Sequence, residues 1–136
     1  MNSTEKEDIW KILRPIGELF KREQYADGLA QLEIEWRKIP EPKHETKNSY
    51  LIVSYGVTFS QKLNDLDKAW VWATRGLLYT GNFNLGGESE LQVGDIAYLR
   101  GDIELAKTYF KMTYANSKSR LFKEKDPKYL ELAKAK

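Results

Sequence analysis

Few residues in this chain combine a type and a spacing that could support enzymatic chemistry. His44 is the only histidine, and the sequence contains no cysteine. Nucleophilic catalysis needs a Ser or Cys beside a base, and a third group that orients this base. His44 stands in a Pro-Lys-His-Glu stretch with no evident carboxylate to orient it. The absence of cysteine excludes a thiolate nucleophile, and a serine triad is strongly disfavoured. We therefore expect a protein that is not an enzyme.

A glycine-rich segment, residues 81–89, superficially resembles a phosphate-binding loop. The position that requires a lysine holds Gly87 or Glu88, and a glutamate would repel the phosphate. We interpret the segment as a flexible turn between two helices. Ser89 is then expected to cap the second of these helices, through a Ser-x-x-Gln box that ends at Gln92.

The carboxylates also give no metal site. Asp65 and Asp67 lack the glycine and the closing glutamate of a calcium-binding loop, so they are expected to cap a helix. Glu33 and Glu35 are two residues apart, which directs them to different faces of a helix. The sequence therefore predicts no metal ion, no cofactor and no small-molecule substrate.

The basic C-terminal segment is the remaining chemical feature. Residues 117–136 carry seven basic and three acidic side chains, a net charge of +4, whereas residues 1–116 carry −2. The cluster could contact phosphates and stack Phe122 and Tyr129 on bases. The whole chain has a net charge of only +2, which is too balanced to make nucleic acid the expected partner. The alternative is a solvated terminal helix. The basic residues concerned are Lys118, Arg120, Lys123, Lys125 and Lys128.

The bulk composition is that of one globular domain. A chain of 136 residues with 41% hydrophobic and 12% aromatic residues can bury a core without a metal or disulfide. We therefore expect a single domain over residues 1–136. The N-terminus is polar and acidic, and no window of the sequence is apolar enough to cross a membrane. A cytoplasmic location is expected.

Helical periodicity dominates the N-terminal part of the chain. Apolar residues recur every three or four positions from Ile9 to Phe20, and Pro15 predicts that this helix kinks or begins late. A second helix is expected to begin near Tyr25 and to end before Pro40.

Residues 50–59 are ambiguous, because their β-branched and aromatic side chains would also suit a buried strand. The sequence that follows, residues 63–70, parallels residues 99–106. This internal repeat favours a helix for residues 50–59.

Residues 94–110 are typical of two helices joined by a tight Gly-Asp turn. Gly94, Ala106 and Phe110 fall where the two helices would touch. Glycine and alanine allow the backbones to approach closely, and phenylalanine fills the space beside them.

This pattern resembles the tetratricopeptide repeat, a helix–turn–helix unit of about 34 residues. Gly28, Ala69 and Ala106 would be the small residues of three second helices, at intervals of 41 and 37 residues. Ala73 departs from the pattern, because a bulky residue is usual there. The resemblance implies an all-α, short right-handed solenoid of three antiparallel helix pairs. The pairs are expected at about residues 9–40, 48–81 and 88–116, followed by a capping helix at about residues 126–136.

In this family the first helices of successive repeats line a concave groove that binds another protein. The resemblance places nine side chains in that groove: Trp10, Leu13, Phe20, Ser54, Thr58, Gln61, Leu91, Asp95 and Tyr98. Three of these positions lack the Lys and Asn clamp of chaperone-binding relatives, namely Leu13, Ser54 and Leu91.

The resemblance therefore implies a protein-binding module. In its size and in its lack of catalytic residues, the chain is similar to tetratricopeptide-like bacterial immunity proteins, which bind and neutralise a cognate toxin. The alternatives are an assembly adaptor or specialised chaperone for peptide segments, and a nucleic-acid-binding regulator that uses the basic C-terminal segment. A monomer is expected.

Overall fold

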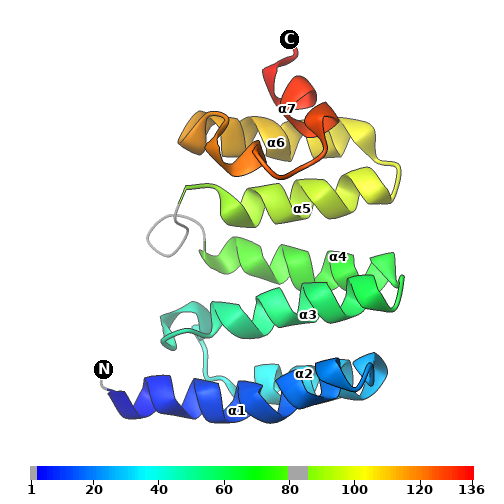
Figure 1. Cartoon of the computed structure of the whole chain (residues 1–136). Helices are drawn as coiled ribbons and strands as arrows, with labels where there is room; N and C mark the ends of the chain where they lie inside the picture. The colour runs from blue at the N-terminus through cyan, green and yellow to red at the C-terminus, as the bar shows by residue number, and fades with distance from the viewer. Residues whose placement is uncertain (1–2, 80–85) are drawn as a thin grey trace. The chain divides into compact units, whose positions relative to one another are not determined.

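The structure is a computed structural model that describes residues 3–79 and 86–136 (Figure 1). Within these ranges the chain forms seven α-helices and three short 3-10 helices, and it contains no strand. The all-helical class is therefore confirmed. None of the described helices is long and apolar enough to cross a membrane. The predicted end of a repeat at residue 81 and the first part of the predicted turn at 81–89 lie outside the described residues.

The chain divides into two compact units, Met1–Trp72 and Ala73–Lys136. The first unit contains α1 (Ser3–Lys21), α2 (Tyr25–Lys38), η1 (Lys43–Glu45) and α3 (Tyr50–Lys62), together with most of α4 (Leu66–Arg75). α2 packs on both α1 and α3. The core of this unit includes fully buried side chains from α1, α2 and α3, such as Leu13, Leu32 and Phe59.

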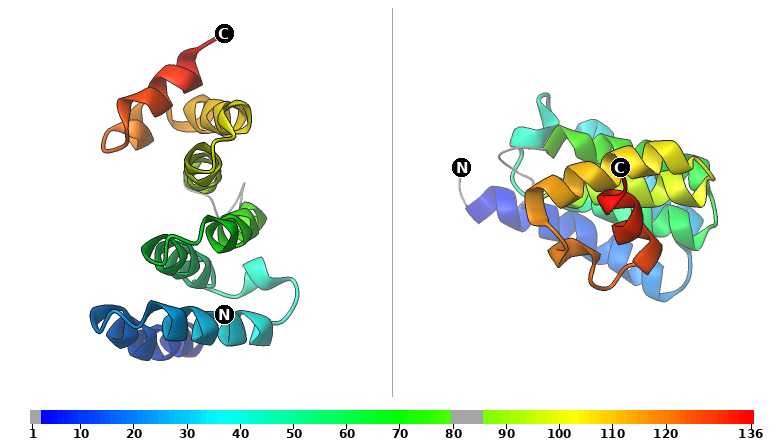
Figure 2. Two further views of the ribbon diagram at one scale, coloured as in Figure 1. Left: turned by 90° about the vertical axis from the view of Figure 1, so that its right-hand side faces the viewer. Right: turned by 90° about the horizontal axis from the view of Figure 1, so that it is seen from above.

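The second unit contains η2 (Gly76–Tyr79), α5 (Glu88–Leu99), α6 (Ile103–Ser117), η3 (Arg120–Phe122) and α7 (Pro127–Lys134). α6 folds back along α5, and α7 lies across α6 (Figure 2). The buried Phe110 of α6 is at the centre of this unit, where its ring contacts those of Phe122 and Tyr129.

The N-terminal helices follow the sequence predictions with one exception. α2 ends at Lys38, before Pro40, and Ile39 has the extended backbone expected near prolines. Of the two outcomes expected at Pro15, a kink or a late start, the late start is excluded, since α1 begins at Ser3 and continues through Pro15. The physical reason is tertiary packing. Ile9 and Ile16, on either side of Pro15 in the chain, are 3% and 0% exposed, and this burial outweighs the hydrogen bond that proline removes.

Residues 50–59 are helical, as the internal repeat predicted, and they form most of α3. This helix is buried along much of its length. Its β-branched residues therefore follow their buried surroundings and not their preference for strands.

Three turns join consecutive helices with the same backbone geometry. Glu23, Asn64 and Gly101 have left-handed φ angles of 59°, 55° and 87°. In each turn the next N–H donates to the carbonyl five residues earlier, which is the hydrogen bond of a Schellman motif. These bonds measure 2.9 to 3.0 Å and join Gln24 to Leu19, Asp65 to Ser60 and Asp102 to Ala97.

Aspartates begin two of the helices that follow these turns. The Asp65 carboxylate accepts a hydrogen bond from the Lys68 N–H at 3.0 Å, and Asp102 accepts one from the Leu105 N–H at 3.3 Å. The predicted role of Asp65 as a helix cap is confirmed. Asp67 lies inside the first turn of α4, two residues after Asp65.

The predicted cap of α5 is wrong. Ser89 lies inside the helix, which starts at Glu88 after Gly87. Gly87 has a left-handed φ of 103°, and a Cβ there would lie 2.9 Å from the Thr113 backbone. The Gly87 carbonyl also accepts a hydrogen bond from the buried Thr113 hydroxyl at 2.9 Å. Because α6 fixes the backbone at Gly87 in this way, the N-cap of α5 is Gly87, two residues before Ser89.

Glycines let pairs of helices approach closely in both units. A Cβ on Gly94 would lie 2.6 Å from the Phe110 ring, so the predicted contact between these residues is confirmed. A Cβ added to Gly28 would lie 2.1 Å from the Phe59 ring, and one added to Gly56 would lie 2.1 Å from the Trp72 ring. The ring that faces Gly56 thus belongs to Trp72, the residue before Ala73.

The predicted C-terminal helix is confirmed as α7. Asp126 is its N-cap and accepts a hydrogen bond from the Lys128 N–H at 3.0 Å, and Pro127 occupies the first turn. The Lys111 ammonium of α6 donates to the carbonyls of Ala133 and Ala135 at the other end. Both ends of α7 are therefore fixed.

Candidate functional site

The nine predicted groove residues lie on three helices in the two units. Two of them, Leu13 and Leu91, are only 1% and 6% exposed, so they can offer a partner almost no surface. Trp10 is 43% exposed, and Thr58 is exposed as well. The other five are half-buried: Phe20, Ser54, Gln61, Asp95 and Tyr98.

In the first unit, the two helices that carry predicted groove residues, α1 and α3, are in contact at Phe20. The Phe20 ring of α1 lies 5.3 Å from the rings of both Tyr25 and Phe59, edge to face. Phe20 is therefore held in an aromatic cluster. The Thr58 hydroxyl donates to the Ser54 carbonyl on its own helix at 3.1 Å. Among these positions Trp10 exposes the most apolar surface to a partner.

In the second unit, α7 covers two of the predicted positions on α5. The Tyr129 ring lies 4.9 Å from that of Tyr98 and stacks on Phe110 at 4.4 Å, and its hydroxyl donates to Asp95. Burial and the Asp95 carboxylate raise the pKa of Tyr129 above its usual value near 10. Asp95 and Tyr98 thus contact the chain's own terminal helix. Whether all nine residues form one groove stays a prediction.

A small hollow of about 300 Å³ lies between α2 and α4 in the first unit. Its lining is mainly apolar, with one residue of each charge, and comprises Ala26, Leu29, Ala30, Glu33, Lys68, Val71 and Trp72. Val71 is 47% exposed, so this hollow offers an apolar contact. The sequence analysis did not select any of these residues for binding.

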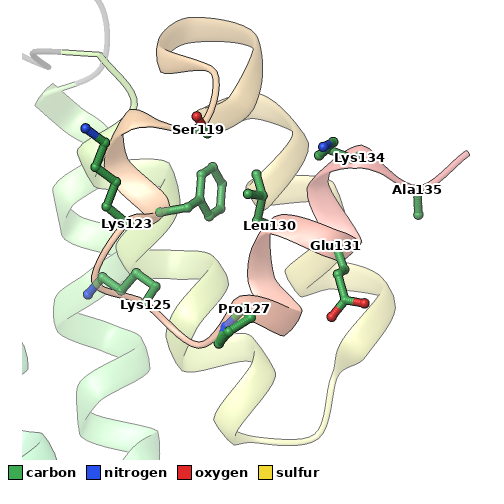
Figure 3. A pocket seen from close by; sticks show the side chains of 9 residues that line it. Ser119, Lys123, Lys125, Pro127, Leu130, Glu131, Lys134 and Ala135 are labelled. Atoms are coloured by element: carbon green, nitrogen blue, oxygen red, sulfur yellow. The ribbon is translucent and has the colours of Figure 1, made fainter.

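A larger hollow, of about 630 Å³, lies between η3 and α7 in the second unit (Figure 3). We call it the C-terminal hollow. Its apolar lining includes Phe122 and Leu130, and its charged lining includes Lys123, Lys125 and Lys134. This volume lies within the range of about 300–1,000 Å³ that is typical of ligand sites.

The residues that were considered for chemistry do not converge. The Glu33 carboxylate lies 3.5 Å from Nε of Arg37, in an ion pair. The Glu35 carboxylate accepts a hydrogen bond from the Gln31 amide at 2.9 Å, so the two glutamates have separate partners. His44 lies in η1. Across residues 3–79 and 86–136, no three His, Cys, Asp or Glu side chains are grouped as metal ligands would be.

Two features of this unit escaped the sequence analysis. The C-terminal hollow depends on η3, a single turn of 3-10 helix whose period is too short to be recognised. The hydrogen bond from Tyr129 to Asp95 joins residues that are 34 positions apart in the chain, and no local sequence pattern predicts such a contact. The available signals were the Asp-Pro start of α7 and the basic cluster around Phe122, of which Lys123 and Lys125 line the hollow.

No protein-family model, no curated protein and no solved structure matches this chain.

Proposed function

We propose that the chain is a tetratricopeptide-like protein, a short right-handed solenoid of three helix pairs followed by a capping helix. The three turns at Glu23, Asn64 and Gly101 support this proposal, because they share one set of hydrogen bonds and the same left-handed residue. Equal turns between helices are what a repeated helix–turn–helix unit requires. Helix pairs of this kind stack by nearest-neighbour contacts.

The function that follows is the binding of another protein without catalysis. Helical repeats build extended surfaces for protein partners, and the repeated turns are the observation that carries this function. Exposed apolar side chains such as Trp10 and Val71 would provide anchors on such a surface. The expected cytoplasmic location and monomeric state belong to the same proposal.

The particular role that we favour is that of a bacterial immunity protein, which binds and neutralises one cognate toxin. This role rests on analogy at the level of fold and size. An assembly adaptor, or a specialised chaperone for peptide segments, is the alternative within the same class. The two roles differ in affinity, because an immunity protein needs a tight complex that dissociates slowly.

A nucleic-acid-binding regulator is the alternative from another class. That role needs exposed aromatic rings on which bases can stack. Phe122 and Tyr129 are only 4% and 5% exposed, and Tyr129 already stacks on Phe110. The burial of both rings favours the protein-binding role.

The first experiment is an affinity capture from native lysate at low and at roughly physiological salt, followed by mass spectrometry. A retained protein is then purified and titrated against the chain in a calorimeter. A one-to-one complex with a Kd on the order of 1 nM supports a dedicated partner. If this partner arrests growth when it is expressed alone, and co-expression of the chain restores growth, the immunity role is supported.

Other results would contradict parts of the proposal. Binding of several short segments at about micromolar Kd would favour the adaptor role. Recovery of nucleic acid alone, with steep loss as salt rises, would overturn the protein-binding function.

A further inference from the structure

The C-terminal hollow has an apolar centre. Phe122 of η3 belongs to its lining. Leu130 and Pro127 line it from α7 (Figure 3). Pro127 and Ala135 extend the apolar lining along α7. Phe122 is 4% exposed and forms the floor of the hollow, whereas the half-buried Leu130 and the exposed Pro127 offer the apolar surface that a side chain of a partner could contact.

The rim of this hollow is positively charged. Lys123 and Lys125 lie on one side and Lys134 lies on the other, whereas Glu131 is the one acidic residue in the lining (Figure 3). Within the described part of the chain, the ammonium groups of these three lysines form no ion pair or hydrogen bond. Their charge is therefore available to a ligand.

The walls of the hollow are held in place before any ligand binds. Tyr129, next to Leu130, is fixed by its stack on Phe110 and its hydrogen bond to Asp95. Phe122 packs against Phe110, with their ring centroids 6.1 Å apart. A preformed site loses little conformational entropy when it binds, which increases affinity.

From these observations we infer that the C-terminal hollow binds an acidic peptide segment of a protein partner. One apolar side chain of the segment packs on Pro127 and Leu130, above the buried Phe122. Its flanking carboxylates lie against Lys123, Lys125 and Lys134. This inference rests on the proposed protein-binding function and names the chemistry of the partner.

Charge and shape favour such a peptide over nucleic acid at this site. Three lysines around a recess for a single side chain match a short acidic segment with one anchor. Single-stranded nucleic acid needs a longer basic groove with several exposed rings. The second unit offers neither Phe122 nor Tyr129 as an open stacking surface.

The test is a titration of the full-length ¹⁵N-labelled chain, followed by NMR. The probe is the acetylated and amidated pentapeptide Asp-Glu-Phe-Asp-Glu, and the matched peptide replaces its Phe with Ser. We expect saturable shifts at the amides around Phe122, Leu130 and Lys134, with a Kd on the order of 100 µM. The Ser peptide should bind about tenfold more weakly, because it leaves the apolar recess unfilled.

A charge reversal at the rim gives the second readout. Lys123→Glu with Lys125→Glu alters two exposed positions and should weaken peptide binding about tenfold or more. The control is Lys11→Glu with Arg14→Glu, two exposed positions on α1 that change the net charge equally. The control variant should bind the peptide as the unaltered chain does.

Three results would overturn the inference. They are shifts that do not saturate, an equal loss of binding in the control variant, and binding of single-stranded oligodeoxythymidine in place of the peptide. The captured partner separates this failure from a failure of the proposed function. If the partner binds the Lys123→Glu, Lys125→Glu variant with unchanged Kd, the protein-binding function stands and the C-terminal hollow is not its site.

Discussion

Gly94 and Gly17 both lie within helices, but their surroundings differ. A Cβ at Gly94 would lie 2.6 Å from the buried Phe110 ring, whereas nothing lies within 4 Å of the corresponding position at Gly17. Gly94→Ala should therefore lower the free energy of unfolding by about 1–3 kcal/mol, because the overpacked ring must move. Gly17→Ala should raise it by about 0.5–1 kcal/mol, through helix propensity alone. Urea unfolding followed by circular dichroism measures both changes, and equal effects would contradict the close contact at Phe110.

The Tyr129 hydroxyl predicts how stability depends on pH in the alkaline range. The folded state raises the pKa of this group, so above about pH 10 the unfolded chain loses the Tyr129 proton while the folded chain keeps it. The free energy of unfolding should therefore fall as the pH rises beyond about 10. Tyr129→Phe should remove this component, and at neutral pH it should lower stability by about 1–2 kcal/mol through the lost hydrogen bond.

Urea unfolding of the unaltered chain and of the Tyr129→Phe variant at a series of pH values measures the contribution of Tyr129, as the difference between their free energies of unfolding. A difference that stays constant through the alkaline range would show that the raised pKa does not contribute to folding.

At the scale of the elements, the repeated turns differ in which residue takes the left-handed position. Glu23 adopts this conformation with a φ of 59°, whereas a Cβ added to Gly101 would have no neighbour within 4 Å. Gly101→Ala should therefore destabilise by about 1 kcal/mol through the backbone alone. Glu23→Asn should stabilise by about 0.5 kcal/mol, since asparagine tolerates this conformation better. Thermal unfolding should show midpoint shifts of opposite sign, and shifts of one sign would contradict the shared geometry.

For the whole molecule, we expect stability to require neither a metal ion nor a disulfide. The sequence has no cysteine and one histidine, and the described residues hold no group of metal ligands. Neither a chelator nor a reductant should therefore change the thermal unfolding midpoint. A fall of several degrees in the presence of a chelator would contradict this and would indicate a bound metal ion.

The local chemistry of the sequence determined the helices and several of their ends. Apolar spacing predicts buried stripes, and Asp126 followed by Pro127 predicts the start of α7 without knowledge of any neighbour. The contact between Gly94 and Phe110 could be predicted for the same reason, because both residues belong to one helix–turn–helix segment.

Tertiary structure decided the features that depend on residues far apart in the chain. Packing around Ile9 and Ile16 carried α1 through Pro15, and the contact with Thr113 placed the N-cap of α5 at Gly87 and not at Ser89. The C-terminal hollow also required the structure, because η3 and α7 form it only once Phe110 fixes Phe122 and Tyr129. Sequence patterns report the preferences of neighbouring residues, whereas burial, caps and hollows are set by free energies that distant residues share.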